Sequence, residues 1–157
     1  MYEIQQKAKK DKDLYRCEPK YPNQRLLLTV GLPLSINHMY VNTGRGGKRL
    51  SKVAEQYVAK TRAYLYAAIK DAKYKKEDKC VWHYVDMVFY MPDRKIRDSH
   101  NLTKLLLDTM EGVLFNDDYY IIPRIQAVEY DKIHPRVEII YKPQKVSERN
   151  NMIEMFA

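Results

Sequence analysis

The chain has 157 residues, 45% of them hydrophobic, which is enough for one domain with a packed core. It holds no run of about 18 apolar residues, and its N-terminus lacks the apolar segment of a signal peptide. This excludes a membrane-spanning helix, and we expect a soluble cytoplasmic protein. The formal net charge of +8 suits a polyanionic partner such as nucleic acid, although basic composition also serves solubility.

The positive charge is concentrated in the first half of the chain. Residues 1–79 carry 18 Lys and Arg against 8 Asp and Glu, a net charge of +10, whereas residues 80–157 carry 10 against 12, a net charge of −2. A basic half beside an acidic pocket favours a polyanion brought to a cation site, because phosphate contacts supply most sequence-independent affinity for nucleic acid.

The two cysteines give no sign of a bridge or of a metal site. Cys17 and Cys80 lie far apart in the sequence, and neither belongs to a paired ligand spacing. We therefore expect both to be reduced thiols.

The first third of the chain predicts an extension, a strand and a glycine-rich ribbon. Residues 1–24 are polar and rich in Lys, so we expect them to fray or to dock only in an assembly. Residues 25–31, RLLLTVG, predict a strand. Residues 32–51 predict a loop with a ribbon whose tip is the segment GRGGKR. That segment lacks the spacing of a nucleotide-binding P-loop, and a mobile, basic loop that contacts phosphate is the better interpretation.

A long amphipathic helix is predicted from Ser51 to about Lys73, because apolar residues recur at helical spacing. Ser51 is a plausible N-cap. A solvated charged face is the simplest interpretation of the basic residues on its outer side. These are Lys52, Lys60, Arg62 and Lys70.

Three strands are predicted in the second half, over residues 80–90, 119–130 and 136–142. Asp86 is either a buried ligand or, as we favour, a carboxylate on an exposed or edge face. Residues 146–157 are an interface segment or a loose tail. Together with a helix that begins near residue 98, these elements predict an α/β fold in one domain, with two main helices packed on a small mixed β-sheet.

The stretch 91–118, MPDRKIRDSHNLTKLLLDTMEGVLFNDD, concentrates polar and acidic residues around that second helix. The segment Asp98-Ser99-His100-Asn101 precedes an apolar helical period, which Gly112 ends. The pair Asp117-Asp118 follows. We expect the two acidic groups, about twenty residues apart, to meet around one divalent cation, because carboxylate oxygens suit Mg²⁺ or Mn²⁺.

Each of these residues also has a structural interpretation. Asp98 is a favoured type of helix N-cap, and His100 alone suits a capping or surface position. The pair Asp117-Asp118 alone suits a turn. Lys104 lies within two helical turns of Asp98 and either points into the same pocket or is solvated. The combination in one short stretch is more specific than any single residue.

The sequence MPDRKIRDSHNLTKLLLDTMEGVLFNDDYYI resembles the signature of the RusA-type Holliday-junction resolvases. In that family a strand ends in Met-Pro-Asp and is followed by Arg-Asp-x-Asp-Asn-Leu-x-Lys on a helix and then by Asp-Asp. The earlier segments LPLSINHMY and LSKVAEQYVAKTR are similar to the family's opening loop and first long helix. The resemblance spans about residues 25–142. We therefore expect a RusA-like endonuclease domain over residues 25–145, between the polar extension of residues 1–24 and the tail of residues 146–157.

The resemblance implies dimeric, Mg²⁺-dependent endonucleases that are common in phages and prophages and act in DNA recombination and repair. They nick four-way DNA junctions in paired fashion and leave 5′-phosphate and 3′-hydroxyl ends. A homodimer is therefore expected here, with four-way junction DNA as partner and Mg²⁺ or Mn²⁺ as cofactor.

Matched position by position, the resemblance implies catalytic roles for Asp98, Lys104 and Asp118. The expected metal ligands are Asp98, His100, Asp118 and the neighbouring Asp117. His100 stands where the family has a carboxylate, and an imidazole binds Mn²⁺ better than Mg²⁺. The expected DNA-binding residues are Arg97, Asn101, Asn37, Arg45, Lys48 and Arg49.

Two other functions fit the sequence less well. If the histidine at position 100, in place of the family's carboxylate, disables the metal site, the protein binds branched DNA with weak or lost cleavage. A Mg²⁺-dependent hydrolase that does not act on nucleic acid is disfavoured by the basic first half.

Overall fold

A four-stranded mixed sheet forms the centre of the fold, with the strand order β1-β6-β4-β5. Strand β4 pairs in parallel with β5 and antiparallel with β6, and β6 pairs antiparallel with β1. The α/β fold that the sequence predicts is confirmed. The strands are β1 (Leu26–Val30), β4 (His83–Met91), β5 (Ile121–Tyr130) and β6 (Arg136–Pro143).

The computed structural model describes residues 16–157. The expectation that residues 1–15 fray or dock in an assembly therefore lies outside the described residues. Within residues 16–157, no helix combines the length and the apolar character that crossing a bilayer requires.

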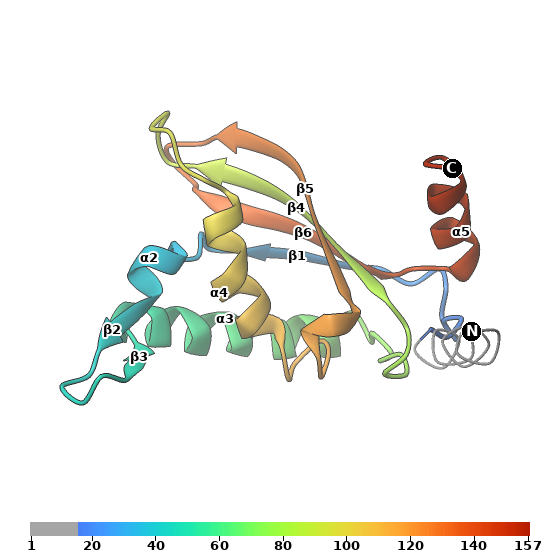
Figure 1. The fold of residues 1–157 in the computed structure, drawn as a ribbon, viewed down its shortest axis with the longest axis horizontal. Coiled ribbons are helices and arrows are strands. Elements are labelled where there is room, and N and C mark those ends of the chain that lie inside the picture. Colours follow the sequence, from blue (N-terminus) through green and yellow to red (C-terminus); the bar gives the residue numbers. More distant parts are fainter. Residues whose placement is uncertain (1–15) are drawn as a thin grey trace, which may run out of the picture.

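Two main helices, α3 (Lys52–Asp71) and α4 (His100–Met110), pack on one side of the sheet (Figure 1). Alternate residues of β1 face them, with the burial pattern expected for a strand that has one covered face. Leu65 of α3 and Leu106 of α4 are fully buried in this core together with Met87 of β4. The Ser51 hydroxyl accepts a hydrogen bond from the Ala54 amide at 3.2 Å, which confirms the predicted N-cap of α3.

The predicted ribbon is present as the antiparallel strands β2 (Tyr40–Asn42) and β3 (Lys48–Leu50). Gly46, in the turn between them, has a φ of +78°, a left-handed conformation that glycine adopts without strain. A short helix, α2 (Ile36–Met39), precedes the ribbon and was not predicted. Met39 at its end is buried against α3 and α4, so it anchors the base of the ribbon to the domain.

A terminal helix, α5 (Val146–Glu154), occupies most of residues 146–157. The sequence left two interpretations of this segment open, an interface segment and a loose tail. Figure 1 shows it beside the end of the sheet, separate from α3 and α4. None of its residues is buried, and the side chains of Met155 and Phe156 beyond it are exposed.

Asp86 differs from the favoured expectation of an exposed or edge carboxylate. It lies on β4, an inner strand, and its side chain is only 11% exposed. The Arg124 guanidinium donates to it at 2.5 and 2.7 Å, and the Gln126 amide donates at 2.9 Å. Burial opposes ionisation, but these hydrogen bonds outweigh it and hold the pKa of Asp86 below its usual value. The carboxylate is therefore a satisfied structural group.

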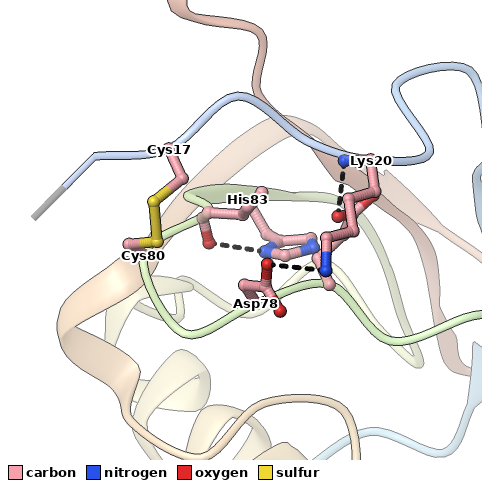
Figure 2. Close-up of a disulfide and its surroundings, with 7 residues drawn as sticks. Cys17, Lys20, Asp78, Cys80 and His83 are labelled. Atoms are coloured by element: carbon pink, nitrogen blue, oxygen red, sulfur yellow. Dashed lines mark hydrogen bonds and ion pairs between the residues drawn. A yellow bond between two sulfur atoms is a disulfide. The ribbon is translucent and has the colours of Figure 1, made fainter.

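The cysteines are joined by a disulfide, so the expectation of reduced thiols was wrong. The Cα atoms of Cys17 and Cys80 lie 5.1 Å apart (Figure 2), and the Cys17 amide donates to the Cys80 carbonyl oxygen at 2.8 Å. The two residues are 63 positions apart in sequence. Only the path of the folded chain brings them together.

Residues 16–24, here called the strap, run along the linker formed by residues 73–80. Both oxygens of the Glu77 carboxylate accept strap amides, from Lys20 at 2.8 Å and Tyr21 at 2.6 Å. The Lys20 ammonium pairs with Asp78 at 3.1 Å (Figure 2). This part of the expected extension therefore docks on its own domain.

Removing the disulfide is expected to lower the free energy of unfolding. The bridge closes a loop across 63 positions, for which the chain-entropy relation gives about 4 kcal/mol. The double variant Cys17→Ser and Cys80→Ser should lose up to that amount in urea denaturation under oxidising conditions. Under a thiol reductant, wild type and variant should coincide. Equal stability of the two under oxidising conditions would contradict the bridge.

Candidate metal and nucleic-acid site

Helix α4 separates two groups of polar residues that the sequence placed in one site. It crosses from the end of β4 to the start of β5, because parallel strands cannot be joined by a hairpin. Asp98 and His100 lie at its start, and Asp117 and Asp118 follow its end. With 11 residues in the helix and a rise of 1.5 Å per residue, the helix is about 16 Å long.

Three carboxylates gather at the end of α4 and form the acidic cluster. Glu111, Asp117 and Asp118 each offer an oxygen atom, and these atoms lie within 4.8 Å of one another. None of the three makes an ion pair within residues 16–157. Three unneutralised carboxylates at this distance repel one another, and a hard divalent cation would relieve that repulsion. The donor set therefore fits Mg²⁺ or Mn²⁺.

The local turns explain how the acidic cluster forms. Glu111 is the C-cap residue of α4, and Gly112 after it has a φ of +81°, which reverses the chain. The Asp117 carboxylate accepts the Tyr119 amide at 2.9 Å and caps a short 3-10 turn, η1 (Asp118–Tyr120). Glu111 was not predicted as a site residue. In the sequence, its position directly before Gly112, which ends the helix, was the signal that could have indicated it.

Arg62 of α3 fixes the end of α4 and with it the position of Glu111. Its guanidinium donates to the carbonyl oxygens of Thr109 at 3.1 Å, Asp108 at 3.2 Å and Glu111 at 3.3 Å. These are carbonyl groups that a helix end leaves without partners. The expectation that Arg62 belongs to a solvated face was wrong, whereas Lys60 and Lys70 of the same helix are exposed.

At the start of α4, Asp98 and His100 bind each other. The Asp98 carboxylate accepts the His100 amide and lies 3.0 Å from the His100 Nδ1. These hydrogen bonds hold the pKa of Asp98 below its usual value. The N-cap is Ser99, which makes no side-chain cap bond, so Asp98 is not the cap itself. Nδ1 is engaged, and Nε2 is the nitrogen that remains for a ligand.

A cavity of about 490 Å³ adjoins Asp98 and brings together four of the predicted residues. Helix α2 contributes Asn37, and the segment around the start of α4 contributes Arg97, Asp98 and Asn101. The Arg97 guanidinium pairs with Asp93, and its hydrogen bond holds the pKa of Asp93 at about 2. Both groups therefore stay charged at neutral pH.

Lys104 lies on an exposed polar face of α4, between the two ends of the helix. His100, Lys104, Asp108 and Glu111 follow one another at spacings of four, four and three, which place them on the same side of a helix. The Lys104 ammonium donates to Asp108 at 2.7 Å, and this hydrogen bond raises the Lys104 pKa, with a smaller contribution from the charge of Asp118. Lys104 is therefore a fixed cation close to the acidic cluster.

The ribbon adds a basic surface that projects from the domain (Figure 1). Arg45, Lys48 and Arg49 are exposed there and make no ion pair within the described part of the chain. Free cations on a projecting hairpin can reach the phosphates of a bound polyanion.

The structure thus brings Asp117 and Asp118 together with Glu111 in the acidic cluster. It brings a second group together around the cavity at the start of α4: Asn37, Arg97, Asp98 and Asn101. Asp98 and His100 are not members of the acidic cluster.

Comparison with known proteins gives one finding. The family model described as "Endodeoxyribonuclease RusA" matches residues 36–141, a range that holds both ends of α4 and the ribbon. No curated protein matches the chain.

The location of the cation can be tested by Mn²⁺ titration followed by electron paramagnetic resonance. If the acidic cluster holds the ion, Glu111→Gln and Asp118→Asn should weaken binding by at least about tenfold, the loss that even outer-shell partners of a metal cause. Asp98→Asn and His100→Ala should change it little. Glu129→Gln, at an exposed position of β5, is the matched control. Equal losses in Asp98→Asn and Asp118→Asn would instead favour the single site predicted from the sequence.

Proposed function

The chain belongs to the RusA endodeoxyribonuclease family, and from this premise we propose that it is a Holliday-junction resolvase that depends on a divalent metal. It would nick four-way DNA junctions in paired fashion and leave 5′-phosphate and 3′-hydroxyl ends. The observation that carries the proposal is the acidic cluster, which lies beside Lys104 inside the range that matches the family. The cytoplasmic location and the phage or prophage origin expected from the sequence stay predictions.

Hydrolysis of a phosphodiester needs an activated water and stabilisation of negative charge on the phosphate oxygens. A divalent cation bound by Glu111, Asp117 and Asp118 would supply the acidified water and polarise the phosphate. Lys104 would stabilise the charge that develops, and its ion pair with Asp108 keeps it protonated for that purpose. Asp98 would act at the N-terminal end of α4, where the cavity that it lines would receive the DNA strand.

Sequence-independent contacts would come from the first half of the chain. The exposed Arg45, Lys48 and Arg49 of the ribbon lie on the same chain segment as Asn37, which lines the cavity beside Asp98. The cavity between α2 and the start of α4 would then orient the DNA backbone along the polar face. Phosphate contacts of this kind fix position without reading the bases.

A homodimer would explain paired cutting. A four-way junction is nearly two-fold symmetric, and a two-fold dimer presents two equal sites to opposed strands. The exposed apolar side chains at the end of α5 support an assembly, because they have no place in the core of this domain.

The alternative of a branched-DNA-binding protein with weak or lost cleavage has one observation in its favour. His100 stands at the position of a family carboxylate, and its ring is engaged with Asp98. If cleavage requires a metal ion at the N-terminal end of α4, the contact between His100 and Asp98 would compete with binding of that ion.

Nicking of a labelled four-way junction in Mg²⁺ and in Mn²⁺ tests the proposal. Wild type should nick in at least one metal. Lys104→Met and Asp118→Asn should slow nicking by about 100-fold or more, because each removes a group that stabilises charge in the transition state, while junction binding persists. Lys132→Met in the β5–β6 turn is the control. Tight binding without nicking in either metal would favour the alternative. If wild type nicks only in Mn²⁺ and the variant His100→Asp also nicks in Mg²⁺, His100 is a metal ligand.

Junction affinity should also fall steeply with salt. Each lost Lys or Arg contact to phosphate lowers the slope of log affinity against log salt by about 1. Replacing Arg45, Lys48 and Arg49 together with Ala should therefore lower the slope by about 3. The single variant Lys70→Ala, near the far end of α3, should leave the slope unchanged. A triple variant with the slope of wild type would exclude the ribbon from DNA binding.

A further inference from the structure

The turn that carries Asp118 is held by aromatic side chains. Asp118 belongs to η1, a 3-10 turn of three residues whose other members are Tyr119 and Tyr120. Both tyrosine rings contact the indole of Trp82, with ring centroids 5.3 and 5.7 Å from it, and they contact each other at 5.1 Å. Separations of this size are favourable for aromatic pairs. Because two of the three side chains of η1 rest on Trp82, the direction of the third, Asp118, depends on where the indole lies.

The first residue of the strap contacts the same indole. The Arg16 guanidinium carbon lies 4.9 Å from the centroid of the Trp82 ring, which is a cation–π contact. The same guanidinium donates to the side-chain oxygen of Gln144 at 2.5 Å, and Gln144 is only 5% exposed. The backbone amide of Gln144 donates to the Trp82 carbonyl oxygen at 2.7 Å. Arg16 and Trp82 are therefore both bonded to one buried residue, which fixes the guanidinium at the indole.

The disulfide joins the chain next to these two residues. Cys17 follows Arg16 directly, and Cys80 precedes Trp82 by two positions (Figure 2). The Cys17 amide also donates to the Cys80 carbonyl oxygen at 2.8 Å. A single cation–π contact is weak by itself, but a covalent link so close to it keeps its two partners at a high effective concentration. The bridge therefore keeps Arg16 at Trp82.

The strap also supports the acidic cluster through the linker. Residues 76–79 of the linker line a cavity of about 300 Å³ together with Asp117 and Tyr120. The strap binds Glu77 and Asp78 in this part of the linker, so it holds a wall that adjoins the cluster. The strap lies before residues 36–141, the range that matches the family, so nothing in that match accounts for these contacts.

We propose that Arg16 and Trp82 are positioning residues of the metal site. They hold Tyr119 and Tyr120, and through these rings they set the direction of the Asp118 carboxylate before a divalent cation binds. Ligands that are already in the bound arrangement cost less to order, which favours binding. Three carboxylates that repel one another would spread apart if the turn were loose. The inference rests on the proposed function, in which the acidic cluster holds the cation.

The first test measures the Mn²⁺ affinity of the full-length protein by electron paramagnetic resonance. Arg16→Gln removes the cation and Trp82→Leu removes the aromatic surface, and each should weaken binding by about tenfold, as the loss of a group that orients metal ligands does. Trp82→Phe keeps a ring for the two tyrosines and should stay close to wild type. Arg94→Gln is the matched control, because it removes a cation–π contact to Tyr130 at the end of β5 far from η1.

The second test uses the emission of Trp82, which is the only tryptophan in the chain. Without metal, Arg16→Gln should make the indole more accessible to quenching by acrylamide, because the strap no longer covers it. Arg94→Gln should leave the quenching as in wild type. Far-UV circular dichroism shows whether each variant is folded. Together these measurements establish that the contact was lost while the domain stayed intact.

Three outcomes would count against the proposal or its premise. If Arg16→Gln makes the indole accessible and Arg16→Gln and Trp82→Leu still bind Mn²⁺ like wild type, while Asp118→Asn binds it more weakly, this inference alone is overturned. If Trp82→Phe binds as weakly as Trp82→Leu, the aromatic support is not what positions Asp118, and the inference is also overturned. If Asp118→Asn itself binds Mn²⁺ like wild type, the acidic cluster is not the metal site, and the proposed function loses its cation together with this inference.

Discussion

The parallel pairing of β4 with β5 is the constraint on which the rest of the structure depends. Two parallel neighbours require a crossover, and α4 makes it by burying Leu105, Leu106 and Met110 fully in the core. The helix must then present its opposite side to solvent, and this side carries Lys104. The same crossover sends the residues before and after the helix to its two ends. Site geometry is thus a consequence of strand order.

The positions of charged groups follow from how each end of α4 is held. At its end, Arg62 binds three carbonyl oxygens, and the reversal at Gly112 returns the chain so that Glu111 meets Asp117 and Asp118. At its start, the Asp98–His100 contact satisfies the exposed polar groups locally. The C-terminal end of α4 gathers three carboxylates that make no ion pair among residues 16–157, whereas Asp98 at the N-terminal end is hydrogen-bonded to His100. Carboxylates that lie this close without an ion pair gain stability from a bound cation.

The strap, residues 16–24, lies against the linker, residues 73–80, near the acidic cluster. It is bonded to Glu77 and Asp78 of the linker, and the Cys17–Cys80 bridge closes one end of that contact. The linker in turn forms one wall of the cavity beside Asp117. A segment remote in sequence from the acidic cluster therefore helps to shape the surface next to it.

The sequence by itself determined the elements that have a local signature. A short apolar run bounded by turn residues marked β1. Helical spacing with a Ser51 cap marked α3, and the motif around α4 indicated the family and two of the three clustered carboxylates. Only the tertiary structure decided which distant groups meet: Cys17 with Cys80, Asp86 with Arg124, and Glu111 with Asp117 and Asp118. The physical reason is that periodicity and capping depend on neighbours within a few residues. Contacts across tens of residues depend on the path that strand order imposes.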